Sequence, residues 1–245
     1  MSPSNWAGQG FDPTNPVATT RADATSMSRF FTQIYTWMAL GLALTGFVAA
    51  YTATSPALLN LVFGNRFGFL GLLLAEFGLV LMFTSSLARG VALPAVFAMF
   101  FVYSALNGLT LSSILLVYTG TSVASTFFIS AGTFAGMSLY GLITRSNLTG
   151  VGQFMRMGVW GLILAMVVNM FLKSSALETA ISLIGVGIFV VLTAYDTQRL
   201  KVLYSSAAAN EDSIKRLGLQ GALMLYLDFI NLFLFLLRFM GRRRD

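Results

Sequence analysis

Cysteine and histidine are both absent from the 245 residues of the chain. Without cysteine, the protein has no disulfide bond, no thiol nucleophile and no thiolate metal site. Without histidine, it has no histidine-based nucleophile relay, no histidine-ligated zinc of the protease type and no histidine pH switch. Any side chain that titrates near neutral pH must therefore be a carboxylate in an unusual environment.

Charged residues are also scarce. They make up 10% of the chain, whereas soluble domains carry about 25%. Hydrophobic residues make up 56%, and they occur in long blocks, which predicts an integral membrane protein whose main partner is the lipid bilayer. The net charge of +6 lies in short loops and at the C-terminus. Membrane proteins place basic residues in this way, so nucleic acid is not an expected partner.

Seven segments are long and apolar enough to cross a bilayer as helices, which needs about 20 residues each. They are residues 30–52, 69–87, 91–118, 122–144, 155–171, 177–203 and 217–240. The sequence therefore predicts an all-α integral membrane protein with seven transmembrane helices. In the fourth segment, Gly132 and Gly136 form a small-xxx-small pattern, which predicts close packing on a neighbouring helix.

A single transmembrane domain is expected over residues 28–241, preceded by a flexible tail over residues 1–27 that is rich in Ser, Thr, Asn, Gly and Pro. Residues 242–245 form a basic C-terminal tail. An N-terminus in the cytoplasm places most basic residues inside, as bilayers favour. These inside residues are Arg21, Arg29, Arg89, Arg145, Arg156, Arg199, Lys201, Lys215 and Arg216. The basic C-terminal tail opposes this orientation, so the side of the C-terminus stays open.

Three acidic residues, Glu76, Asp196 and Asp228, lie inside the predicted spans. A charge at the bilayer centre costs at least ~2.5–3.5 kcal/mol, so such residues usually face protein or a water-filled cavity. Asp228 shares a helix face with Asn231, three residues further on. Asp196 either pairs locally with Arg199 or meets Asp228. Glu76 is either a second site carboxylate or a packing residue bonded to a neighbouring helix.

If Asp196 and Asp228 approach each other, they cannot both ionise cheaply in a low-dielectric setting, and the pair shares a proton. Such a pair forms a pH-sensitive latch without histidine. Once the proton is lost, the carboxylates must separate or recruit a cation. Calcium suits two hard oxygen ligands of this kind, so a transient calcium site at Asp196 and Asp228 is expected, with no resident cofactor.

Two sequence motifs surround these aspartates. Residues 225–233 read Leu-Tyr-Leu-Asp-Phe-Ile-Asn-Leu-Phe, and residues 194–198 read Ala-Tyr-Asp-Thr-Gln, followed by Arg199. Together with Glu76 in the second segment, they resemble the Bax inhibitor-1 family, also called the transmembrane Bax-inhibitor-motif family, which has bacterial members. The resemblance extends over residues 29–241, essentially everything except the N-terminal tail.

This resemblance implies a fold in which six helices wrap a central seventh. It also implies that Asp196 and Asp228 form a pH-responsive pair that gates a calcium leak. Tyr195, Arg199, Asn231 and Glu76 would support the pair. In some bacterial members a basic residue near the end of the second span interacts with the aspartates, and Arg89 is the nearest candidate here.

Two other functions compete with a cation leak. Some bacterial relatives are linked to a membrane-bound ATP-dependent protease, which makes a role as an adaptor or modulator of such a protease the alternative. Intramembrane aspartyl proteolysis is disfavoured, because those enzymes carry Gly-x-Gly-Asp where this chain has Leu225-Tyr226-Leu227-Asp228. We therefore expect no enzymatic activity. The short tail and the lack of an organelle-retention signal favour a bacterial inner membrane.

Overall fold

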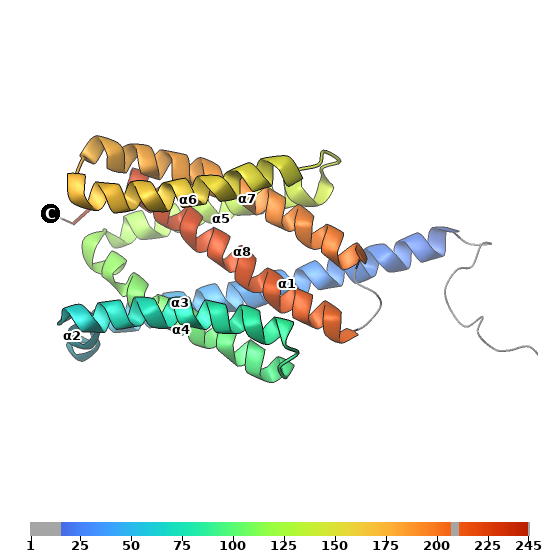
Figure 1. Cartoon of the computed structure of the whole chain (residues 1–245), viewed down its shortest axis with the longest axis horizontal. Helices are drawn as coiled ribbons and strands as arrows, with labels where there is room; N and C mark the ends of the chain where they lie inside the picture. Colours follow the sequence, from blue (N-terminus) through green and yellow to red (C-terminus); the bar gives the residue numbers. More distant parts are fainter. Residues whose placement is uncertain (1–15, 207–210, 245) are drawn as a thin grey trace, which may run out of the picture.

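The computed structural model describes residues 16–206 and 211–244, and these residues form a bundle of long helices (Figure 1). The helices are α1 (Pro16–Thr54), α2 (Pro56–Phe63), α3 (Arg66–Ala88), α4 (Leu93–Val117), α5 (Gly120–Ile143), α6 (Thr149–Leu172), α7 (Ser175–Ser206) and α8 (Glu211–Met240).

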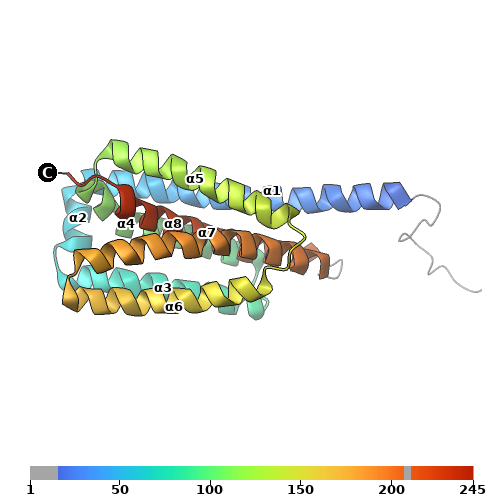
Figure 2. The same cartoon turned by 90° about the horizontal axis from the view of Figure 1, so that it is seen from above.

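Seven of the described helices, all except α2, are long and apolar enough to cross a membrane. The prediction of an all-α integral membrane protein with seven spans is therefore confirmed. Successive long helices run in opposite directions, so that the start of α1 and the end of α8 lie at opposite ends of the bundle (Figures 1 and 2). The last helix thus crosses the whole bundle.

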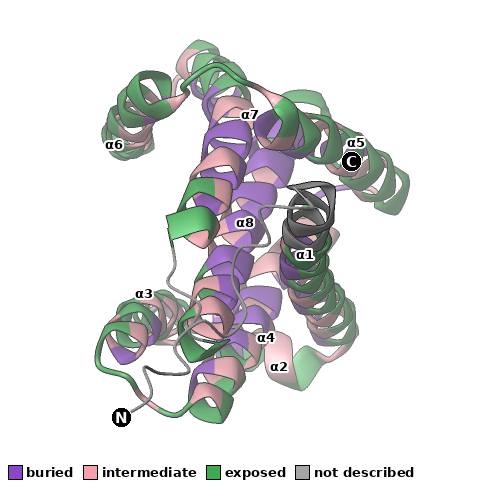
Figure 3. Ribbon diagram, turned by 90° about the vertical axis from the view of Figure 1, so that its right-hand side faces the viewer, coloured by how far each residue is buried: buried purple, intermediate pink, exposed green. Residues whose placement is uncertain are grey.

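Helix α8 occupies the centre of the bundle and is the most buried of the spans (Figure 3). Of the residues in its apolar 18-residue stretch, 56% are buried. It packs against α7, α1, α5, α4 and α3. Its sequence is apolar around nearly its whole circumference, which is the pattern of a helix surrounded by protein. Helix α6 packs mainly on α7, and α7 in turn packs on the central helix α8.

The outermost spans present their side chains to lipid. In α3 and in α6, only 6% of the residues in the apolar 18-residue stretch are buried. Large side chains on these helices, such as Phe77, Trp160 and Phe171, are 66%, 70% and 76% exposed. In water, so much exposed apolar surface would cause aggregation. In a bilayer these side chains contact lipid tails instead, which accounts for their number on the outer helices.

The ends of the chain differ from the sequence-based prediction. Helix α1 already begins at Pro16, so residues 16–27 are helical rather than a flexible tail, while residues 1–15 lie outside the described residues. A proline suits the first helical position, because its missing N–H has no partner there in any case. The prediction also missed α2, an eight-residue helix that begins at Pro56 after Ser55, whose hydroxyl accepts from the N–H of Leu58.

The C-terminal residues are fixed to the turn between α4 and α5. The N–H of Thr119 donates to the carbonyl of Arg242 at 3.1 Å, and the N–H of Arg244 donates to the carbonyl of Val117 at 2.8 Å. The Arg243 guanidinium also lies 3.1 Å from a carboxylate oxygen of Glu178, at the start of α7. The predicted basic tail is therefore bonded to the turn between α4 and α5 and to the start of α7, and it fixes the end of α8 to these neighbours.

Close helix packing occurs at other glycines than predicted. Among the described residues, no neighbouring helix comes within 4 Å of a Cβ built at Gly132 or Gly136, so the small-xxx-small prediction is wrong. In contrast, a Cβ at Gly141 would lie 2.3 Å from the carbonyl oxygen of Ala194. Gly141 thereby lets α5 approach the backbone of α7 just beside the motif that carries Asp196, and it helps to fix the position of that motif.

Candidate functional site

Asp196 on α7 and Asp228 on α8 lie together inside the bundle. Each residue is 6% exposed, and their carboxyl groups lie close enough to interact with each other. Asp196 lies ten residues before the end of α7, whereas Asp228 lies seventeen residues after the start of α8. The two come level because α8 crosses the bundle obliquely (Figure 1).

A carboxylate accepts hydrogen bonds and donates none, so a hydrogen bond between two carboxyl groups requires a proton on one of them. Among the described residues, no N–H or O–H group donates to Oδ2 of Asp228, which is fully buried. A buried acceptor without a donor costs roughly 1–3 kcal/mol, and more when it is charged. A proton shared with Asp196 would satisfy this oxygen, for which the described residues provide no other donor.

Arg156 on α6 completes the site, and sequence reasoning missed it. Its Nη2 lies 3.3 Å from Oδ1 of Asp196, and its guanidinium stacks over the ring of Tyr195 at 4.8 Å from the ring centre. Gly152 lies one turn before Arg156, and a Cβ there would stand 2.2 Å from the Tyr195 ring. The sequence offers little signal for it, since Arg156 lies at the start of an apolar segment, where basic residues are common.

The other predicted supporting residues are placed differently. Arg199 acts on Asp196 through its charge, but it forms no ion pair with it within the described residues, so the local pairing is absent. Asn231 donates to the carbonyl of Leu227 in its own helix at 2.8 Å. Arg89 is exposed at the C-terminal end of α3. The structure brings Arg156, and not Arg89, to the aspartates.

Glu76 forms a separate polar contact on the other side of α8. Its Oε1 accepts a hydrogen bond from the Thr110 hydroxyl of α4, and its charge acts on the buried Tyr103 and Tyr226. Of the two roles considered from the sequence, the structure favours a residue bonded to a neighbouring helix. Glu76 does not join Asp196 and Asp228.

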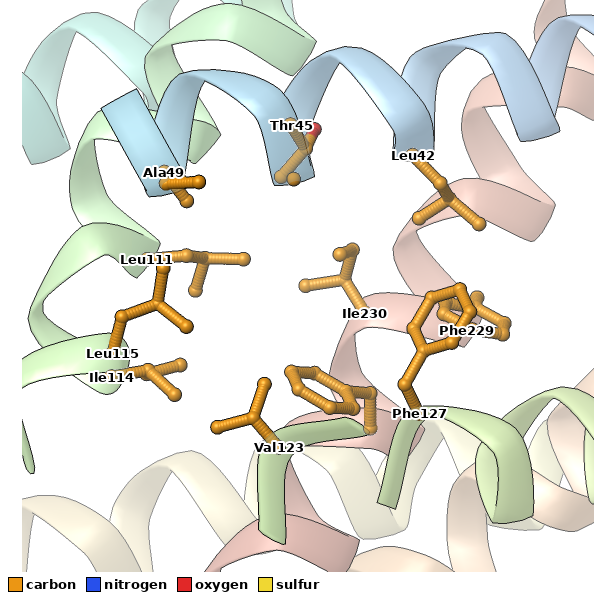
Figure 4. Close-up of a pocket in the computed structure, with 13 residues that line it drawn as sticks. Leu42, Thr45, Ala49, Leu111, Ile114, Leu115, Val123, Phe127, Phe229 and Ile230 are labelled. Atoms are coloured by element: carbon orange, nitrogen blue, oxygen red, sulfur yellow. The ribbon is translucent and has the colours of Figure 1, made fainter. Parts of the chain in front are cut away.

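The residues that directly follow Asp228 on α8 line an apolar cavity. A cavity of about 250 Å³ lies between α1, α4, α5 and α8, and Phe127, Phe229 and Ile230 line it (Figure 4). The hydroxyl of Thr45, which also lines it, bonds to the Tyr226 hydroxyl at 2.7 Å and to the carbonyl of Ser104 at 2.8 Å. The polar groups at this level are thus occupied, and the cavity lining is almost wholly apolar.

The site offers few ligands for a metal. Within residues 16–206 and 211–244, no group of three or more Asp, Glu, His or Cys side chains could hold a metal ion. Calcium normally takes 6–8 oxygen ligands. Asp196 and Asp228 supply two carboxyl groups, so a calcium ion bound there would take most of its ligands from water.

Comparison with known proteins agrees with these motifs. Residues 27–245 match the family described as inhibitor of apoptosis-promoting Bax1. The chain is 47% identical over 219 residues to the inner membrane protein YbhL of Escherichia coli K12, covering 89% of this chain and 93% of that protein. It is 44% identical over 237 residues to RP147 of Rickettsia prowazekii, covering 96% of this chain and 99% of that protein. The chain belongs to the Bax inhibitor-1 family.

Proposed function

We propose that this protein is a passive, pH-sensitive cation leak, with calcium as the ion that suits it best, and that the pair of Asp196 and Asp228 is its gate. The proposal rests on the burial of these two interacting carboxyl groups between α7 and α8, because a buried pair of carboxyl groups is stabilised when it shares one proton. The proposed activity is transport, and no chemical step is assigned to the aspartates.

Loss of the shared proton places two negative charges side by side in a buried position. At about 4 Å and an effective dielectric constant of ~20, their repulsion is ~4 kcal/mol. Arg156 offsets some of this repulsion, but its side chain is 42% exposed and is screened by solvent. A difference of several kcal/mol is enough to shift a two-state equilibrium strongly. Deprotonation therefore drives α7 and α8 apart at this level, or a cation takes the proton's place.

We assign the closed state to the apolar side chains around the cavity that Phe229 and Ile230 line (Figure 4), and we call them the apolar closure. An ion cannot shed its water among apolar side chains, and such constrictions block conduction until they become wet. Because Phe229 and Ile230 directly follow Asp228 on α8, movement of Asp228 also moves the two side chains that close the path. The proton and the apolar closure are thus coupled through one helix.

The orientation that fits this function places the N-terminus in the cytoplasm of a bacterium, with the bundle in its inner membrane. The relative YbhL is an inner membrane protein by name. The end of the bundle at which α1 begins carries the basic residues of three connections, among them Arg89, Arg145 and Lys215. Basic residues favour the cytoplasmic side.

Calcium flux into liposomes tests the proposal directly. The purified full-length protein is reconstituted into vesicles loaded with a calcium-sensitive dye, and the initial rate is measured from about pH 5 to pH 8. We expect the leak of the wild-type protein to increase as the pH rises and the proton is lost. Asp228→Asn keeps a permanent donor to Asp196, so its leak should be low and independent of pH.

Asp212→Asn is the matched control, because it removes a carboxylate from the exposed first turn of the same helix. This variant should keep the wild-type pH profile. A wild-type rate no higher than that of empty vesicles at every pH would refute the leak. A wild-type pH profile in Asp228→Asn would refute the aspartate gate.

A further inference from the structure

A second, polar cavity opens at the end of the bundle where α7 ends. It has a volume of about 520 Å³ and lies between the connection from α5 to α6 and the last turns of α7. Figure 3 looks onto this end and shows that connection passing over α7. Three basic side chains line the cavity, Arg145, Arg199 and Lys201. We call it the basic pocket.

The basic pocket carries positive charge that the described residues do not neutralise. No acidic side chain is among its described lining residues, which otherwise carry hydroxyl and amide groups such as those of Thr149, Asn147 and Ser205. Lys201 Nζ donates to the carbonyl of Leu142 at 2.7 Å, which orients the ammonium group but leaves its charge uncompensated. Over residues 16–206 and 211–244, neither Arg145 nor Arg199 forms an ion pair.

Helix α6 adds to this field, because it begins at Thr149, in the lining of the pocket. The N-terminal end of a helix carries partial positive charge and favours anions. Gln198 closes the other side, with its amide N–H donating to the carbonyl of Ser146 at 2.8 Å and its oxygen accepting from the N–H of Leu148 at 2.9 Å. These bonds hold the connection over the pocket in one conformation, so the cations are preorganised.

An apolar groove of about 410 Å³ lies next to the basic pocket, between α1 and α5, and Met38, Phe134 and Leu139 are among its lining residues. Leu142 connects the two features, since its side chain lines the groove and its carbonyl binds Lys201. The groove lies within the spans, whereas the pocket lies at their ends, where lipid headgroups are found. A ligand that fits both has an anionic head and a hydrocarbon tail.

We propose that the basic pocket binds the phosphate of an anionic membrane lipid, with an acyl chain of that lipid in the groove between α1 and α5. Arg145 and Lys201 contact the phosphate, and the hydroxyl groups of the pocket bind its remaining oxygens. Charge-assisted bonds from Arg and Lys are the strong ones for phosphate. The proposal of lipid binding does not rest on the cation leak and is tested by a different measurement.

The test uses the delipidated full-length protein in neutral detergent, titrated with dioleoylphosphatidylglycerol or dioleoylphosphatidylcholine, with bound lipid counted by native mass spectrometry. We expect the wild type to retain phosphatidylglycerol ~10- to 30-fold more tightly than phosphatidylcholine, as two basic contacts near a membrane surface would give. Arg145→Gln combined with Lys201→Gln should abolish the difference. Arg145→Lys combined with Lys201→Arg should retain it.

The matched control is Arg242→Gln combined with Arg244→Gln, which removes the same charge from the opposite end of the bundle and should leave the preference unchanged. Equal preference in the Arg145 and Lys201 double Gln variant and the wild type would overturn the proposal. Glycerol 3-phosphate is added as a competitor. Displacement of the lipid by glycerol 3-phosphate at an equal concentration would also overturn it, because the site would then recognise a free phosphate ester rather than a lipid.

Discussion

Arg156 reaches Asp196 from the outermost helix of its side of the bundle, with Nη2 3.3 Å from Oδ1. The two residues are 40 positions apart in the chain. The ring of Tyr195, beside Asp196, supports the arginine. The aspartate on α7 thus has a cation from α6 on one side and a carboxyl group from α8 on the other, so side chains from three helices meet at Asp196.

Replacement of Arg156 by Gln should move the midpoint of the pH-dependent leak to higher pH. Without the cation, a second negative charge on the pair costs more, so the proton is retained at higher pH. An ion pair with a partly exposed arginine is worth about 0.5–1 kcal/mol, which corresponds to ~0.4–0.7 pH unit. The liposome flux assay measures the midpoint. Arg156→Lys keeps the charge and should shift it less, whereas a lower midpoint in Arg156→Gln would contradict the role assigned to the ion pair.

Gly141→Ala should destabilise the bundle. Its Cβ would lie 2.3 Å from the carbonyl oxygen of Ala194, and backbone atoms of a packed helix cannot yield as a flexible side chain can. Overpacking of this kind typically costs about 1–3 kcal/mol. Thermal unfolding in detergent, followed by tryptophan fluorescence, measures the loss.

Gly136→Ala, on the same helix, is the control for Gly141→Ala, because its Cβ would meet no atom within 4 Å. Alanine is the better helix former, so its unfolding midpoint should equal or exceed that of the wild type. If both variants unfolded at the same temperature, the close approach of α5 to α7 at Gly141 would be unsupported.

Glu76→Gln should leave the pH profile of the leak unchanged. Glu76 bonds to Thr110 and lies on the other side of α8 from Asp196, and glutamine can still accept that hydrogen bond. The variant therefore removes a carboxylate from the membrane interior without touching the aspartate pair. Flux rates across the same pH range check this, and a flattened profile would place Glu76 in the gate.

The two ends of the bundle should be labelled from opposite sides of the membrane. Because the chain has no cysteine, a single introduced thiol reports its position without a background. In bacterial spheroplasts, a membrane-impermeant maleimide should label Arg244→Cys directly and Ser206→Cys only after permeabilisation. Labelling of Ser206→Cys in intact spheroplasts would reverse the proposed orientation.

Sequence reasoning located the seven spans because apolar blocks of sufficient length are a strong signal. It located the two aspartates because charge is costly in a membrane. It could not establish that they meet, since this depends on the oblique path of α8. It missed α2, which is too short to span, and Arg156, whose position near the end of a span is ordinary for a basic residue. Gly132 and Gly136 misled it, because a pattern of small residues does not specify which face has a neighbour.

The fixed end of α8 restricts how the helix can move. Backbone hydrogen bonds at Val117 and Thr119 hold residues 242–244, while Asp228 lies fourteen residues before Arg242, at a distance of ~21 Å along a helix. We expect a helix anchored in this way to tilt about its C-terminal end rather than to slide along its own axis. A tilt of about 10° then carries Asp228 sideways by ~4 Å. This displacement is enough to separate its carboxyl group from that of Asp196 while the C-terminal end of α8 stays in place.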